Sequence, residues 1–124
     1  MGATTTTPQA PAEIGGPSTK ELAGTKLLYE YSTGRKYQLN FDPDNVTFIF
    51  VKDPAAKPMS LPYRARKIRE NLYMVHWLNR EGHIHVTLLL DLERRQVHVS
   101  ALMPGGIEFF DIAEIEKAER PTGK

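Results

Sequence analysis

Hydrophobic and polar residues alternate along much of this chain in short segments, most clearly over residues 72–91. Residues 72–78 and 83–91 alternate with a period of two around the polar residues 79–82, which is typical of a β-hairpin. Because successive side chains of a strand point to opposite faces, pairing Leu78 with His83 makes one face wholly apolar. The other face is mixed and carries three of the four histidines. The pattern predicts a sheet with one buried face.

Similar apolar segments recur about every ten residues with turn residues between them, which is typical of an all-β sandwich or barrel. One long connection, residues 53–60, contains Pro54 and Pro58, and such loops on β scaffolds often surround a binding site. We expect eight antiparallel strands in up-and-down order, near residues 25–32, 35–41, 46–52, 62–68, 72–78, 83–91, 96–102 and 107–116.

The composition changes at both ends of the chain. Residues 1–24 are rich in Thr, Pro, Gly, Ala and Ser, and their only large aliphatic residues are Ile14 and Leu22. So little apolar area does not offset the entropy lost on ordering. We therefore expect a flexible tail over residues 1–24, one barrel domain over 25–118, and a flexible carboxyl terminus over 119–124.

The turns predict which side chains face inward. A turn with a left-handed residue at Gly34 aligns Tyr29 with Tyr37, and one at Asn71 aligns Tyr63 with Trp77. All five tyrosines then share the inner face. Converging phenols indicate a site for an aromatic or polar ligand, because a buried hydroxyl needs a partner. Alternatively, tyrosines are simply good strand residues whose hydroxyls reach solvent. The candidate ligand-binding residues are Tyr29, Tyr31, Tyr37, Phe50, Tyr63, Tyr73, Trp77 and Asn79, although Asn79 could instead only shape its turn.

The histidines of the outer face form a weak metal candidate. The expected pairing places His76 opposite His85 with His83 diagonal to both, an arrangement that can bind zinc. Arg64 and Arg66 beside His76 disfavour a cation, so we expect no metal. The favoured interpretation is an outer surface that contacts a partner subunit through Met74, Leu78 and Leu89, which predicts a homodimer.

Acidic residues near the carboxyl terminus are the candidates for acid or base chemistry. The facing of Asp111, Glu114 and Glu116 is undecided, because Phe109 and Phe110 are adjacent and either could point inward. There is no Gly-X-Ser-X-Gly elbow and no phosphate-binding glycine-rich loop.

The composition excludes several function classes. The chain has 124 residues, enough for one domain with a core, and it has no cysteine, which excludes thiol chemistry and favours the cytoplasm. A formal net charge of +1 offers no drive toward nucleic acid or anionic membranes. No apolar run approaches the ~20 residues that span a bilayer, and no secretory signal is evident. We expect a soluble cytoplasmic protein without a cofactor.

Two motifs carry a family resemblance: Tyr-X-Tyr-X-X-Gly-X-X-Tyr at residues 29–37 and Tyr-X-Val-X-Trp at residues 73–77, with further similarity at 45–48 and 82–88. Over about residues 25–116, the chain resembles the calycin-like barrels of the MoaF-like and phenolic acid decarboxylase group. The resemblance implies an eight-stranded, lipocalin-like barrel with a small-molecule cavity, often dimeric. Tyr29, Tyr31 and Tyr37 match tyrosines that line the decarboxylase site.

The same resemblance argues against hydroxycinnamate decarboxylation. Asn79 stands where the decarboxylase pattern has its catalytic glutamate, and the Gly-Gly-Arg-Trp segment with the catalytic arginine has no counterpart near residues 57–60. The leading hypothesis is a MoaF-like barrel that binds a small aromatic or largely apolar metabolite. One alternative is an isomerase, cyclase or lyase that uses interior tyrosines and a carboxylate. Another is a dimeric interaction module with a filled barrel.

Overall fold

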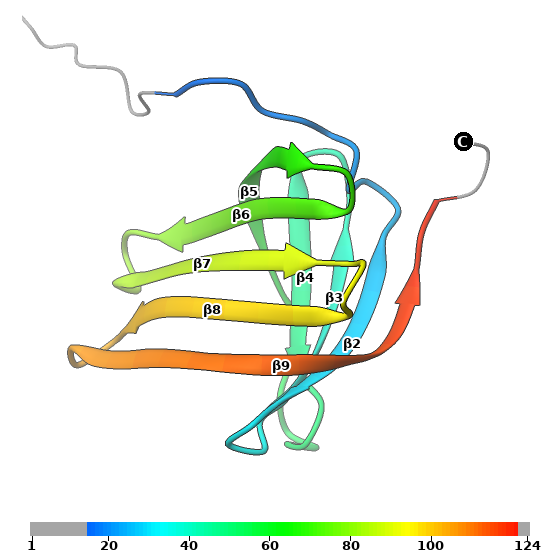
Figure 1. Cartoon of the computed structure of the whole chain (residues 1–124). Helices are drawn as coiled ribbons and strands as arrows, with labels where there is room; N and C mark the ends of the chain where they lie inside the picture. The colour runs from blue at the N-terminus through cyan, green and yellow to red at the C-terminus, as the bar shows by residue number, and fades with distance from the viewer. Residues whose placement is uncertain (1–14, 122–124) are drawn as a thin grey trace, which may run out of the picture.

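The computed structural model describes residues 15–121 and shows one closed antiparallel barrel (Figure 1). Eight strands follow one another around the barrel in sequence order, and the last pairs with the first. The strands are β2 (Lys26–Tyr31), β3 (Lys36–Phe41), β4 (Asn45–Phe50), β5 (Met59–Arg69), β6 (Leu72–Asn79), β7 (Ile84–Asp91), β8 (Gln96–Met103) and β9 (Ile107–Glu119).

The expected all-β, up-and-down architecture is confirmed, and so is most of the register. Tyr29 pairs with Tyr37 across β2 and β3, and Tyr63 pairs with Trp77 across β5 and β6. Gly34 and Asn71 have φ angles of 96° and 64°, the left-handed conformation expected at these turns. Alternation on the strands therefore determines the inner face, as the pattern predicted.

The pairing of β6 with β7 differs from the expectation by two residues. Leu78 pairs with His85 rather than with His83, because the turn spans residues 80–83 and closes between Asn79 and Ile84. His83 adopts a φ of 57°, and the Asn79 Oδ1 accepts a hydrogen bond from the Gly82 N–H at 3.0 Å. A shift of two residues leaves each side chain on its expected face, so the core assignment survives.

The two ends of the barrel differ in how they are closed. Four turns surround one end, here called the open end: those that join β2 to β3, β4 to β5, β6 to β7 and β8 to β9 (Figure 1). The other three turns and the segment that enters β2 surround the second end, here called the closed end. This division follows from the topology, because an even number of up-and-down strands brings both chain ends to one rim.

Residues 15–25 run along the barrel to the closed end and pack there (Figure 1). Leu22 and Thr25 are fully buried, and the Thr19 N–H donates to the carbonyl oxygen of Ala65 at 2.8 Å. Phe41 and Gly24 complete the attachment, with the Gly24 N–H donating to the Phe41 carbonyl at 2.7 Å. The part of the expected tail that the structure describes is thus attached to the barrel, while residues 1–14 lie outside the described residues.

Within residues 15–121, no helix is long and apolar enough to cross a membrane. The cytoplasmic location expected from the sequence stays a prediction.

Candidate functional site

An interior cavity of about 270 Å³ lies at the open end of the barrel. Its volume falls just below the ~300–1,000 Å³ of typical ligand sites, so it suits a molecule smaller than most drugs. β5, β6 and β9 contribute one wall residue each, every other strand contributes two or more, and the connection from β4 to β5 closes one side. The wall is formed by Tyr29, Tyr31, Tyr37, Leu39, Phe48, Phe50, Ala56, Lys57, Met59, Trp77, Ile84, Val86, Leu88, Val99, Ala101, Met103 and Phe109.

Aromatic rings make up one side of this cavity. Tyr31 lies edge-on to Tyr29, with ring centroids 5.3 Å apart, and edge-on to Phe109 at 4.9 Å. Tyr37 and Phe50 continue the cluster with centroids at 5.5 Å. Edge-to-face contacts of this kind are favourable between aromatic rings. The cluster therefore offers the same kind of contact to an aromatic ring of a bound molecule. Four of the eight sequence-predicted ligand residues therefore meet in one cluster.

The phenols of Tyr29 and Tyr31 are close neighbours and remain protonated. Burial, followed by the neighbouring phenols, raises the pKa of Tyr29 well above its ordinary value. Burial also raises the pKa of Tyr31. Both hydroxyls consequently act as neutral hydrogen-bonding groups and are poor bases at physiological pH.

Trp77 lies on β6 across the cavity and is 4 % exposed. Its indole stacks on Phe48 with centroids 5.7 Å apart and an interplanar angle of 28°. Among the described residues, its Nε1 is the one buried side-chain nitrogen or oxygen without a hydrogen-bond partner. A buried N–H without a partner is costly, which makes this atom the natural donor for an oxygen atom of a bound molecule.

Two cations at the open end, Arg35 and Lys57, lie beside the cavity, and the sequence pattern did not select either of them. Arg35 donates from Nε and Nη2 to the Tyr37 hydroxyl at 3.1 and 2.9 Å. Its guanidinium also lies 4.9 Å from the Phe50 ring centroid, a cation–π distance. Lys57, on the connection from β4 to β5, contributes to the wall. Arg35 follows the Gly34 turn, and only the closure of the barrel brings it over residues of β4 and β9.

The remaining predicted ligand residues lie away from the cavity wall. Tyr63 and Tyr73 are buried toward the closed end, where their hydroxyls donate to the Asp42 carbonyl at 2.7 Å and to Glu21 Oε1 at 2.8 Å. The amide of Asn79 bonds within its own turn, as the alternative interpretation expected. The inward orientation of all five tyrosines is confirmed, but only three of them reach the cavity.

The acidic residues on β9 are now assigned to faces. Phe109 points inward, whereas Phe110 is 80 % exposed, and Glu114 and Glu116 lie on the exposed face. Asp111 accepts hydrogen bonds from Ser32 and Thr33 in the turn between β2 and β3. Although burial opposes the shift, these bonds and the Ile112 N–H lower the Asp111 pKa to about 2. Asp111 therefore fastens the turn, and no carboxylate lines the cavity within residues 15–121.

The expected histidine arrangement is wrong in its pairing. His76 faces Thr87, and His85 faces Leu78, because of the two-residue shift in register. The rings of His76 and His85 remain diagonal neighbours, with centroids 5.7 Å apart. The described part of the chain contains no group of three or more acidic or histidine side chains that could hold a metal ion.

Comparisons with known proteins agree with this fold. The family model described as MoaF-like matches residues 23–113, which is most of the chain. The protein belongs to the MoaF-like family. The match confirms the resemblance stated from the two tyrosine motifs, and it covers every strand except the end of β9.

A solved structure from Burkholderia vietnamiensis, described as a proposed beta-lactamase, shares the architecture of this MoaF-like chain. The TM-score is 0.70 at 12 % identity, over 79 % of this chain and 95 % of the other. At this identity the likeness shows the fold alone. No curated protein matches the chain.

Proposed function

We propose that this MoaF-like barrel binds a small, largely apolar and preferably aromatic molecule in its interior cavity. The observation that carries the proposal is a void of about 270 Å³ between an aromatic cluster and Trp77, inside a barrel that is otherwise packed. Cavities of this kind, apolar with a few placed polar groups, are typical of ligand sites.

The polar groups of the wall specify the ligand further. The Trp77 N–H requires a hydrogen-bond acceptor, so we expect a carbonyl or ether oxygen on the ligand. Arg35 and Lys57 at the open end favour a partial or full negative charge on the part of the ligand nearest solvent. The class that fits is a small aromatic ketone, aldehyde or acid.

Binding is favoured over catalysis by the titratable groups present. A proton-transfer enzyme needs a group whose pKa is tuned toward the working pH. The pKa values of Tyr29 and Tyr31 are raised instead, and that of Asp111 is lowered. The isomerase, cyclase or lyase alternative therefore has less support than a binding role, and the void argues against a filled barrel.

The proposal is tested with acetophenone and ethylbenzene, which have similar shapes but differ in one acceptor oxygen. Trp77 is the only tryptophan, so a ¹⁵N-labelled sample gives one indole N–H signal that reports directly on the cavity. We expect saturable shifts with both probes, tighter binding of acetophenone by ~5-fold or more, and a downfield indole shift with the ketone.

Trp77→Phe is the matched variant, because it keeps a ring against Phe48 and removes the N–H. It should bind both probes with similar affinity, as measured by calorimetry. Absence of saturable binding of either probe to the natural protein contradicts the proposed function. Equal affinity for the two probes contradicts only the role of the indole.

A second candidate role is self-association through the outer face. Met74, Leu89, His98 and Ile112 are consecutive cross-strand neighbours on β6 to β9, and three of them are apolar and at least 37 % exposed. Phe110, on the neighbouring row, is 80 % exposed. A row of this kind suits the self-complementary interface of a twofold dimer.

Sedimentation velocity tests the dimer. We expect the natural protein to sediment as a dimer at micromolar concentration and the variant Phe110→Ser to shift toward monomer. Thr47→Ser, on the opposite outer face at β4, is the control and should leave the distribution unchanged. A natural protein that sediments as a monomer at all accessible concentrations contradicts this role.

A further inference from the structure

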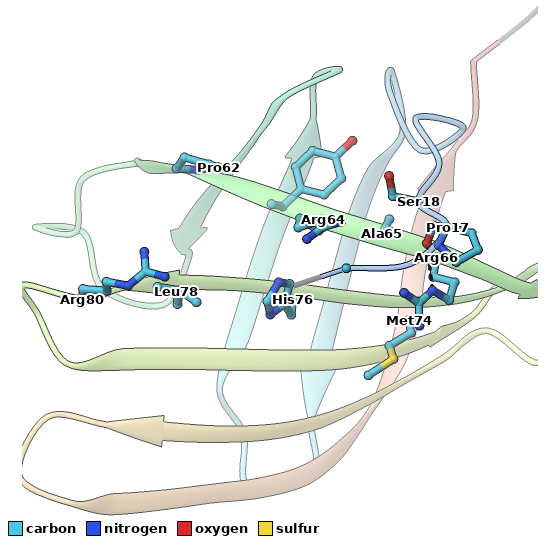
Figure 2. A pocket seen from close by; sticks show the side chains of 12 residues that line it. Pro17, Ser18, Pro62, Arg64, Ala65, Arg66, Met74, His76, Leu78 and Arg80 are labelled. Atoms are coloured by element: carbon cyan, nitrogen blue, oxygen red, sulfur yellow. Dashed lines mark hydrogen bonds between the residues drawn. The ribbon is translucent and has the colours of Figure 1, made fainter. Parts of the chain in front are cut away.

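Arginine side chains lie beside two hollows of this barrel, and they make different contacts. The outer hollow, of about 440 Å³, lies on β5 and β6 and shares no lining residue with the interior cavity (Figure 2). There the Arg66 Nε donates to the Pro17 carbonyl at 2.8 Å, so this side chain holds the segment that leads to β2 against the sheet. At the cavity, by contrast, Arg35 lies over rings that form the wall.

Strand alternation directs Arg35 toward the interior of the barrel. It stands two residues before Tyr37, which lines the cavity, so both side chains leave the same face of the chain. The turn that carries Arg35 is held at both of its ends. The Arg35 carbonyl accepts a hydrogen bond from the Tyr31 N–H at 2.7 Å, and the Thr33 hydroxyl donates to Asp111 at 2.8 Å. The backbone of Arg35 is therefore fixed at the rim of the open end.

The guanidinium of Arg35 lies over rings from three strands. Its Cζ is 4.9 Å from the ring centroid of Phe50 on β4, and 5.8 Å from those of Tyr37 on β3 and Phe109 on β9. Two strands separate β4 from β9 in the barrel, so a group that approaches inward-facing rings of both must lie inside the curve of the sheet. Arg35 therefore covers the aromatic side of the cavity mouth.

Two kinds of contact keep the Arg35 side chain in this position. Its Nε and Nη2 donate to the Tyr37 hydroxyl, and its guanidinium attracts the faces of the neighbouring rings. Arg35 is otherwise exposed to solvent, and cation–π contacts at exposed sites are individually weak. A ligand that extends into this position can displace the side chain, but it loses affinity because these contacts are broken.

We propose that Arg35 limits the length of the ligand that the interior cavity binds. The inference rests on the proposed function, in which an oxygen of the ligand accepts from the Trp77 N–H and its ring contacts the aromatic cluster. Trp77 and the cluster lie on opposite sides of the cavity, so the end of the ligand remote from that oxygen points toward the cluster and Arg35. A single ring ends beneath the guanidinium, whereas a longer rigid ligand collides with it. Arg35 is thus a specificity-determining residue.

Acetophenone and 4-acetylbiphenyl test the proposal, because the second ketone adds one rigid ring opposite the acetyl group. The readout is the ratio of the two dissociation constants, measured by calorimetry on the full-length protein. The Trp77 indole N–H signal shows that each probe enters the cavity. We expect the natural protein to bind 4-acetylbiphenyl at least ~10-fold more weakly than acetophenone, because the longer probe must displace Arg35 from its rings and from Tyr37.

Arg35→Ala removes the obstruction. It should raise the affinity for 4-acetylbiphenyl relative to acetophenone at least ~10-fold, because the second ring then gains apolar contact. Lys36→Ala is the matched control: it removes the same charge from the next residue, whose side chain forms an ion pair with Glu116 on the outer surface. This control should keep the ratio of the natural protein.

The possible outcomes separate the length limit from the proposed function. Equal binding of the two ketones by the natural protein, or the same ratio in Arg35→Ala and Lys36→Ala, overturns the length limit alone. Binding of 4-acetylbiphenyl by Arg35→Ala, when the natural protein binds neither ketone, supports the closure by Arg35 and contradicts the proposed function. Absence of binding in all three proteins overturns both.

Discussion

The two ends of the barrel use the same alternation of side chains but complete their interiors differently. At the closed end, residues 15–25 supply Leu22 to the core, and the hydroxyls of Tyr63 and Tyr73 have fixed protein acceptors. At the open end no segment within residues 15–121 fills the space, and the rings of Tyr29 and Tyr31 line the cavity. Side chains face the interior at both ends of this barrel. The packed core and the candidate site therefore differ in how much of the interior space is filled, and not in which side chains point inward.

The largest effect on stability is expected from Leu22→Ala, which removes a core side chain from the closed end. Leu22 is fully buried in a well-packed cluster, so the loss of apolar burial plus the new cavity should lower the free energy of unfolding by ~2–5 kcal/mol. Met103→Ala, at the wall of the existing cavity, is the control and should cost clearly less. Urea unfolding measures both; equal losses would mean that the two ends are equally packed.

Two alanine-to-leucine variants test the same difference in packing between the filled core and the cavity. Ala65 is buried among packed neighbours, so Ala65→Leu should lower stability by ~1–3 kcal/mol through overpacking. Ala101 lines the cavity, so Ala101→Leu should leave stability within ~1 kcal/mol of the natural protein and weaken acetophenone at least ~10-fold. Thermal unfolding and calorimetry check both; a destabilised Ala101→Leu that still binds acetophenone would contradict an accessible void.

Removal of single hydroxyls should show a smaller contrast. Tyr63→Phe loses a bond to the Asp42 carbonyl and should cost ~1 kcal/mol of unfolding free energy. Tyr37→Phe loses a bond from the exposed Arg35 and should change stability by less than ~0.5 kcal/mol. Chemical denaturation of the two variants side by side measures the difference, and the reverse order would contradict it.

The smallest predicted effect is a pH dependence at the open end. The pKa of Asp111 is 3.8 in its ordinary state and about 2 in the folded protein. A lowered folded pKa means that its contribution to stability is complete above pH ~4 and is lost as the pH falls toward ~2. Asp111→Asn should lose this part of the acid response in urea melts between those pH values. An unchanged slope would show that Ser32 and Thr33 do not favour the ionised form.

Most of the fold could be predicted because strand periodicity and turn residues act locally. Gly34 and Asn71 took the left-handed conformation that set the pairs Tyr29–Tyr37 and Tyr63–Trp77. The turn at residues 80–83 was misjudged, because four polar residues permit more than one closure and only the chain geometry at His83 selects between them. Five of the eight predicted ligand residues line the cavity, because the direction in which a strand side chain faces is set locally, whereas its depth in the barrel is not.

The sequence by itself determined the strand order, the inner face and the MoaF-like motifs, since each depends on residues close together in the chain. Tertiary structure alone decided which end is filled, because Leu22 and Tyr73 join one core cluster only after the barrel closes. It also decided where the empty space and the unpaired Trp77 N–H lie. Packing depends on the distances between segments far apart in sequence, and no periodicity records them.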